Sequence, residues 1–235
     1  MKGKLYLIPT LIADNTQQEV VSPRILETVK SLNYFLCENV RTARRFVSSL
    51  RVAQSIESLR FEVLDKDTEP DALPSLLSPL LEGKDIGVLS ESGCPGIADP
   101  GALAVSYAHQ NQIRVIPLVG PSSIFLAIMA SGLNGQQFAF HGYLPVDADE
   151  ARSVVRKLEK ESREKNQTQA FIETPYRNNA LLGHLLKSLH DNTQLCLASN
   201  LTSHDEKIIC QEVRKWKKLA LKLDKVPSVF LFLAS

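Results

Sequence analysis

Short apolar runs and amphipathic segments alternate along most of the chain, and this alternation is the feature that most limits the possible fold. The apolar run at residues 4–8 ends at Pro9 and predicts a buried strand. Ser22 and Pro23 then supply the N-cap and the first-turn proline that favour a helix. The same pattern recurs to about residue 199. Strands that alternate with helices at this spacing predict an α/β fold with mainly parallel sheets covered by helices.

The predicted elements follow one another through short connections. Strands are predicted at 4–8, 34–37, 85–89, 113–118, 138–141, 169–173, 195–199, 207–212 and 228–233. Helices are predicted from Ser22 onward and at 42–50, 71–81, 102–109, 122–131, 148–165 and 178–189. The last two strands lack a full crossover helix, which predicts a mixed second sheet. The acidic stretch 57–71 is interpreted as solvated surface.

Length and composition indicate a globular protein of one large domain or two small ones. A chain of 235 residues with 44% hydrophobic and 23% charged residues can fill one or two cores. The segment 117–121 contains two prolines and is the best candidate for a hinge, which gives predicted domains 1–117 and 118–235. No apolar run approaches the roughly 20 residues that span a bilayer, and the N-terminus has no signal-peptide pattern. We therefore expect a cytoplasmic protein without a membrane segment.

Charge and cysteine usage exclude some classes of function. The net charge of +1 argues against nucleic-acid binding over the whole surface, although a local basic patch remains possible. The four cysteines lie far apart, with no CxxC pair and no histidine at ligand spacing. We expect neither a metal site nor a disulfide framework.

The segment SESGCPGIADPG, from Ser90 to Gly101, is the strongest candidate for a ligand-binding loop. It follows a predicted strand and precedes a predicted helix, and open parallel sheets bind ligands at the carboxyl ends of their strands. Its glycines would let the backbone approach a ligand closely, and Asp99 and Pro100 suit the N-cap and first position of the next helix. The segment matches neither phosphate-binding glycine motif, so it favours a small polar cofactor. The alternative is a rigid loop without a ligand.

Other predicted strand ends also carry polar residues. The segment VGPSS at 119–123 opens an apolar helix, where free amides can face a carboxylate or simply cap the helix. Glu38 and Arg41 follow one strand, the segment 173–177 follows another, and Ser199 and Asn200 follow a third. A glutamate near an arginine is more often a structural ion pair than a catalytic pair. Several polar strand ends around one cleft favour the functional alternative.

Taken in order, these segments resemble the tetrapyrrole methylase superfamily of S-adenosylmethionine-dependent methyltransferases. The branch they resemble most is the bacterial ribosomal RNA small subunit methyltransferase I group. The similarity is carried by SESGCPGIADPG, which matches the group's SDAGTPGISDPG, and by four further segments. These are VGPSS at 119–123, ASGL at 130–133, FAFHGYLP at 138–145 and ETPYR at 173–177.

The resemblance implies two α/β domains with the cofactor in the cleft between them, a homodimer, and a site for S-adenosylmethionine without a metal. The implied cofactor-binding residues are Pro9, Ser92, Gly93, Cys94, Pro95, Ile97, Ser122, Ser123, Ile124, Ala198, Asn200 and Leu201. The implied catalytic residues are Glu38, Arg41 and Glu173, with Glu38 or Glu173 as the base. The implied substrate-binding residues are Arg44, Arg45, Tyr176 and Arg177.

The reaction implied by this branch is 2′-O-methylation of a cytidine ribose in small-subunit rRNA, with RNA as the partner. Two alternatives remain open. One is a methyltransferase of the same superfamily that acts on a tetrapyrrole or another small molecule. The other is a cofactor-binding, non-catalytic protein associated with RNA.

Overall fold

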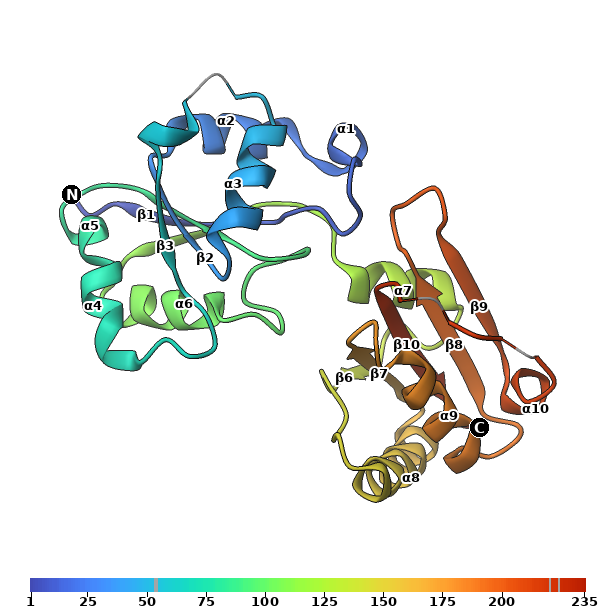
Figure 1. The fold of residues 1–235 in the computed structure, drawn as a ribbon. Helices are drawn as coiled ribbons and strands as arrows, with labels where there is room; N and C mark the ends of the chain where they lie inside the picture. Colours follow the sequence, from blue (N-terminus) through green and yellow to red (C-terminus); the bar gives the residue numbers. More distant parts are fainter. Residues whose placement is uncertain (53–54, 220, 224) are drawn as a thin grey trace. The chain divides into compact units, whose positions relative to one another are not determined.

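The chain forms two compact units, Met1–Ser122 and Ser123–Ser235. The computed structural model describes residues 1–52, 55–219, 221–223 and 225–235. The predicted boundary lay between 117 and 118. Each unit contains one five-stranded sheet with its own helices (Figure 1).

The first unit is built on a wholly parallel sheet with the strand order β3-β2-β4-β1-β5. The strands are β1 Lys4–Ile8, β2 Tyr34–Cys37, β3 Arg60–Val63, β4 Ile86–Leu89 and β5 Arg114–Pro117. The segments between them form α1 Gln17–Val20, α2 Pro23–Ser31, α3 Val40–Ser49, η1 Ile56–Ser58, η2 Pro70–Ala72, α4 Leu73–Leu76, α5 Ser78–Leu81 and α6 Gly101–Gln110.

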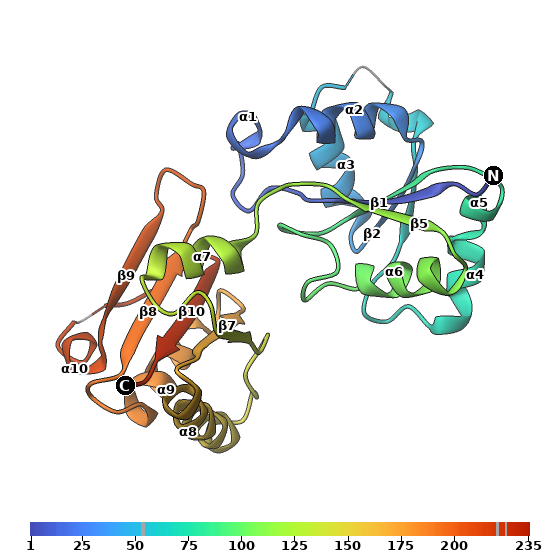
Figure 2. The same cartoon turned by 180° about the vertical axis from the view of Figure 1, so that it is seen from behind.

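Both faces of this sheet are covered, which explains why its central strands are apolar on both sides. On one face, Ile8 and Phe35 pack with α2 and α3. On the other, Leu36 and Val88 pack with the segment from α4 to α6 (Figures 1 and 2). As the sequence predicts, Ser22 caps α2 by accepting a hydrogen bond from the Ile25 N–H at 3.4 Å.

The second unit contains a mixed sheet with the strand order β6-β7-β10-β8-β9. Its strands are β6 Phe138–Phe140, β7 Thr168–Glu173, β8 Gln194–Ser199, β9 Lys207–Glu212 and β10 Ser228–Leu233. Its helices are α7 Ser123–Ser131, α8 Ala148–Lys165, α9 Asn178–Ser188 and α10 Val213–Trp216. β6 runs parallel to β7, whereas β10 is antiparallel to both neighbours and β9 is antiparallel to β8. The predicted fold class, including the mixed second sheet, is confirmed.

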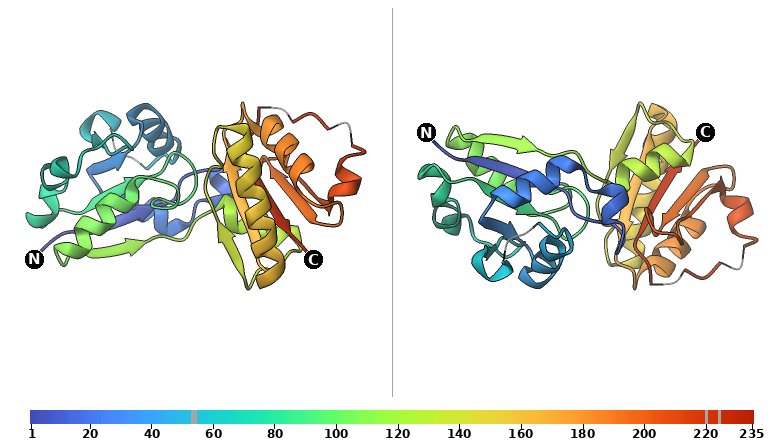
Figure 3. Two further views of the ribbon diagram at one scale, coloured as in Figure 1. Left: turned by 90° about the horizontal axis from the view of Figure 1, so that it is seen from below. Right: turned by 90° about the horizontal axis from the view of Figure 1, so that it is seen from above.

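Helices cover both faces of the second sheet. The side chains of α8 and α9 join Phe171 and Phe230 in one apolar core, and α8 lies along this side of the sheet (Figure 3). α7 contacts β8, β9 and β10, and Figure 2 shows it across these strands. Among the described residues, no helix combines the length and apolar character that a membrane crossing requires.

Two segments differ from the sequence prediction. The stretch 57–71 was interpreted as surface, but it contains the edge strand β3, whose Phe61 ring stacks on Phe35 with centroids 5.2 Å apart. The single helix predicted at 71–81 is divided into η2, α4 and α5. Pro74 and Pro79 cause this division, because a proline lacks the N–H that a continuous helix needs and fits only in a first turn.

The C-terminal strand is fixed to α8 through one buried hydroxyl, which gives a stability prediction. Ser162 Oγ donates to the Gln167 carbonyl at 2.8 Å and accepts from the Ala234 N–H at 2.9 Å. Ser162→Ala leaves both backbone groups without this partner, so we expect a loss of about 1–3 kcal/mol in the free energy of unfolding. Denaturant unfolding measures it, with Ser153→Ala on the exposed face of α8 as control. Equal losses in both variants would contradict the prediction.

Candidate functional site

Because all strands of the first sheet are parallel, the loops after β1, β2, β4 and β5 leave the sheet at one edge. Strand β1 lies between β4 and β5 in the sheet, so the loop that begins at Pro9 lies between the two glycine-containing loops. The predicted cofactor residues of this unit therefore come together: Pro9, Ser92, Gly93, Cys94, Pro95, Ile97 and Ser122.

Direct hydrogen bonds join these loops. The Thr10 N–H donates to the Gly93 carbonyl at 2.9 Å, and the Thr10 hydroxyl donates to the Ser90 carbonyl at 3.0 Å. The Cys94 thiol donates to the Pro121 carbonyl at 3.3 Å. Thr10 was not predicted as a site residue, although its place directly after the first strand end was a usable signal.

Two glycines are needed where the loops meet. Gly93 has φ of +74°, and a Cβ there would lie 3.3 Å from the Pro121 carbonyl oxygen. At Gly120, a Cβ would lie 2.3 Å from the Pro9 Cβ, a distance that excludes any side chain. Gly93 is itself buried, so these two glycines allow the three loops to pack closely against one another.

Asp99 shapes the second half of the Ser90–Gly101 loop. Its Oδ1 accepts hydrogen bonds from the Gly96 N–H at 2.9 Å and the Gly101 N–H at 2.7 Å. Pro100 stands at the N-cap of α6, not at the predicted first helical position, and Asp99 still satisfies a first-turn amide. Asp99 Oδ2 is buried and accepts no hydrogen bond from any described residue.

The carboxyl group of Glu38 lies close to this loop. β2 pairs with β4 so that Cys37 is opposite Leu89, which places Glu38 beside the start of the Ser90–Gly101 loop. Partial burial, the Asp99 carboxylate and a hydrogen bond to it raise the pKa of Glu38 to about 7, with smaller contributions from Glu91 and Asp65. Below that pH, Glu38 carries a proton that it can donate to Asp99.

Glu38 and Arg41, which the sequence left open as a structural ion pair or a catalytic pair, form no ion pair with each other. Arg41 lies in the first turn of α3 and is exposed, and its side chain has no ion pair or hydrogen bond with a described residue. Asn39 caps α3 by accepting from the Arg41 N–H at 2.9 Å and the Thr42 N–H at 3.3 Å. Arg41 is therefore free to meet a ligand. Arg44 is also exposed on α3.

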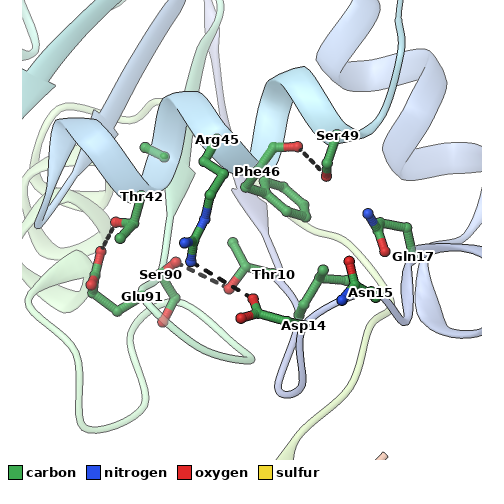
Figure 4. Close-up of a pocket in the computed structure, with 12 residues that line it drawn as sticks. Thr10, Asp14, Asn15, Gln17, Thr42, Arg45, Phe46, Ser49, Ser90 and Glu91 are labelled. Atoms are coloured by element: carbon green, nitrogen blue, oxygen red, sulfur yellow. Dashed lines mark hydrogen bonds and ion pairs between the residues drawn. The ribbon is translucent and has the colours of Figure 1, made fainter. Parts of the chain in front are cut away.

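A pocket of about 370 Å³ opens between the loop after β1 and α3 (Figure 4). It is lined by residues of the segment 10–17, by α3 from Thr42 to Ser49, and by Ser90 and Glu91. Arg45, a predicted substrate-binding residue, lies here at 3.7 Å from Asp14. Sequence analysis missed the other lining residues, because nothing in the sequence places the segment 10–17 next to α3.

In the second unit, Glu173 and Arg177 form a close pair. The Glu173 side chain is only 1% exposed, Oε1 accepts from the Thr174 N–H at 2.7 Å, and Oε2 lies 3.2 Å from Arg177. Arg177 also donates to the Pro145 carbonyl at 3.4 Å. Both carboxylate oxygens of Glu173 thus have a partner. This arrangement is that of a structural ion pair, one of the two alternatives that the sequence left open.

The remaining predicted residues of this unit lie at two kinds of position. Tyr176 is 78% exposed, and the Lys225 ammonium lies 4.8 Å from the centre of its ring. Ala198, Asn200 and Leu201 stand at the end of β8, where a pocket of about 480 Å³ is lined in part by Ser199 and Asn200. Ser123 and Ile124 begin α7.

Within the described ranges, no group of three or more His, Cys, Asp or Glu side chains is arranged to hold a metal ion.

Two solved structures of methyltransferases have the same fold. Uroporphyrin-III-C-methyltransferase from Thermus thermophilus aligns with a TM-score of 0.57 at 17% identity, over 99% of this chain and 93% of the other. The methyltransferase CobJ aligns with a TM-score of 0.64 at 16% identity, over 99% of this chain and all of the other. The fold is thus that of the tetrapyrrole methyltransferases.

Comparison with known sequences finds relatives within one group of methyltransferases. Ribosomal RNA small subunit methyltransferase I of Buchnera aphidicola subsp. Schizaphis graminum is 29% identical over 206 residues, which are 88% of this chain and 68% of that protein. The protein of the same name from Escherichia coli O157:H7 is 28% identical over 207 residues, with the same coverage. No family model matches the chain. These comparisons identify the chain as a methyltransferase similar to the ribosomal RNA small subunit methyltransferase I group, with the fold seen in tetrapyrrole methyltransferases.

The raised pKa of Glu38 predicts a pH-dependent effect on stability. The folded protein holds this proton up to about pH 7, whereas an ordinary glutamate releases it near 4.5. The resulting stabilisation is fully present below pH 4.5 and is lost as the pH rises through 7. Glu38→Gln keeps a neutral donor toward Asp99, so its melting temperature should rise relative to the parent between pH 5 and pH 8.

Thermal melts at these two pH values test this prediction, with Glu69→Gln at an exposed position as the control. A difference between Glu38→Gln and the parent that is the same at both pH values would contradict it.

Proposed function

We propose that the protein uses S-adenosylmethionine to methylate the 2′-hydroxyl of a cytidine in small-subunit rRNA. The observation that carries this proposal is the group of joined loops around Gly93 at the carboxyl edge of the first sheet. The named relatives, which are similar over 88% of the chain, support rRNA as the acceptor. Since rRNA is made and matured in the bacterial cytoplasm, we propose that compartment for the enzyme.

The loops joined around Gly93 suit a small polar cofactor, because ligands bind at the carboxyl edge of open parallel sheets and this edge carries several polar loop residues. We assign cofactor binding in the first unit to Pro9, Ser92, Gly93, Cys94, Pro95, Ile97 and Ser122. In the second unit we assign it to Ser123, Ile124, Ala198, Asn200 and Leu201. S-adenosylmethionine supplies a methyl group on a sulfonium, so the protein needs only to align the acceptor and exclude water.

Glu38 is the better candidate for the base. Its pKa of about 7 lies near the working pH, which is where general-base catalysis is most effective. The Glu38 carboxylate would take the hydroxyl proton while the ribose oxygen forms its new bond to the methyl carbon, and the bond from that carbon to the sulfonium sulfur would break, with S-adenosylhomocysteine as the leaving group. Glu173 is buried against Arg177, so we assign it the role of holding Arg177, which with Arg41 binds phosphates.

RNA binding would rest on a local group of exposed side chains, because the net charge of the whole protein is only +1. Arg41, Arg44 and Arg45 are exposed on α3, and in the second unit the exposed Tyr176 can stack on a base.

We also propose a homodimer, because α7 exposes Phe125 and Met129 one helical turn apart, with 52% and 78% exposure.

The function is tested by methyl transfer from labelled S-adenosylmethionine to small-subunit rRNA, to assembled subunits and to a tetrapyrrole. We expect transfer to one cytidine ribose, with a rate that rises with pH through about 7 as Glu38 loses its proton. Glu38→Gln should lower this rate by about 100- to 10,000-fold, the usual range for a general base, and keep cofactor affinity.

Glu69→Gln serves as the control for this variant. Transfer only to the tetrapyrrole would overturn the rRNA assignment, and cofactor binding with no transfer to any acceptor would favour a non-catalytic protein.

Substitution of Gly93 tests the position of the cofactor site. Valine there meets both the Pro121 carbonyl and the positive φ, so Gly93→Val should abolish detectable S-adenosylmethionine binding in calorimetry. Its stability should fall by about 1–3 kcal/mol for a strained backbone position, while Gly96→Ala, with more room, should be milder.

Gly132→Val is a matched control, because Gly132 also has positive φ but no atom within 4 Å of its Cβ position. If Gly93→Val folds and binds the cofactor like the parent, the loop has only a structural role.

A further inference from the structure

The pocket beside α3 has the size and lining of a binding site for a small organic ligand. Its volume of about 370 Å³ falls within the range of small-molecule sites, about 300–1,000 Å³. Phe46 and Ala43 are buried residues of α3 and give it an apolar wall. The polar residues of the segment 10–17 lie opposite this wall (Figure 4).

Asn15 and Gln17 give this pocket the groups that read a nucleobase. Each side-chain amide offers both donors and an acceptor, as the edge of a base requires. Neither side chain forms a hydrogen bond with another residue in the described parts of the chain. Asn15 is held in the left-handed region with φ of +65°, which fixes its backbone at the pocket wall.

Arg45 gives the pocket a phosphate-binding group. Its ion pair with Asp14 is long, at 3.7 Å, and both side chains are more than 70% exposed, so little is lost when the guanidinium turns to another anion. Asp14 and Glu91 also line the pocket and would repel a bare phosphate deep inside it. A nucleotide whose single phosphate lies near Arg45 would pair with the guanidinium and keep its negative charge away from the two carboxylates.

The pocket also adjoins the loop that we assign to the cofactor. Ser90 and Glu91, which line it, are the first two residues of that loop, and Thr10 in its wall donates to the Ser90 carbonyl. The Thr42 hydroxyl of α3 donates to the Glu91 carboxylate, which holds this side of the pocket to the loop.

We propose that this pocket binds one nucleotide of an RNA strand, with Asn15 and Gln17 against the base and Arg45 against its phosphate. The inference rests on the proposed function only in taking RNA as the acceptor. It assigns base recognition to the segment 10–17, which carries none of the residues predicted from the sequence to bind substrate.

Titration of cytidine 5′-monophosphate into ¹⁵N-labelled full-length protein tests the proposal by NMR. The side-chain amide signals of Asn15 and Gln17 should shift and saturate. Gln17→Ala should weaken binding about three- to tenfold, the effect of one lost hydrogen bond. Gln18→Ala, its exposed neighbour in α1 outside the pocket, should bind like the parent. Arg45→Gln should weaken binding of the monophosphate and leave that of cytidine unchanged.

Titration of ribose 5-phosphate, which has the phosphate but no base, shows whether the pocket recognises the base or only the phosphate. Equal affinity for ribose 5-phosphate and cytidine 5′-monophosphate, or an unchanged affinity in Gln17→Ala, overturns the proposal. Methyl transfer to rRNA by the parent is measured in parallel. If transfer occurs but the nucleotide shifts no pocket signal, this inference fails and the proposed function stands. If the nucleotide binds in the Gln17-dependent way but rRNA is not methylated, the pocket is supported and the proposed function fails.

Discussion

The parallel pairing of β1 with both β4 and β5 is the constraint on which the candidate site depends. It brings the ends of three strands to one sheet edge and leaves so little room that Gly120 must pack directly on Pro9. Thr10 can then bond to two carbonyl groups of the Ser90–Gly101 loop. The glycines at positions 93 and 120 are thus required because they allow the loops to approach one another closely.

Much of the fold could be predicted from the sequence because its signals are local. Apolar runs mark the buried strands, and the boundaries of β1, β9, β10 and α8 agree with the predicted ranges. The errors also have local causes. β3 is an edge strand whose Arg60 and Glu62 pair with each other at 2.8 Å, so its charge pattern looks like surface. The segment 71–81 was predicted as one helix because its apolar periodicity continues across the two prolines that divide it.

The candidate site could be predicted only in part. Its residues lie far apart in the sequence and come together because of the order of the strands in the sheet. Nothing in the sequence shows that β2 lies next to β4, yet this pairing brings Glu38 to the loop of Asp99. The same limit applies to the pocket beside α3, where Asn15 and Gln17 lie 25 or more positions before the helix residues they face. The Gly93 loop was accessible to prediction since its composition is unusual within twelve consecutive residues.

The two glutamates that the sequence could not rank differ in what surrounds them. Glu173 has both oxygens engaged, by a backbone amide and by Arg177, and its side chain is almost wholly buried. A carboxylate whose two oxygens are both held in this way serves to position its partners, above all the Arg177 guanidinium. Glu38 is half-buried among other carboxylates, so binding a proton relieves repulsion. The buried Asp99 Oδ2 offers that proton an acceptor while Asp99 Oδ1 holds the Gly96 and Gly101 amides. Proton binding to Glu38 is therefore favoured by the same residue that shapes the Ser90–Gly101 loop, which supports the proposal that Glu38 and not Glu173 acts as the base.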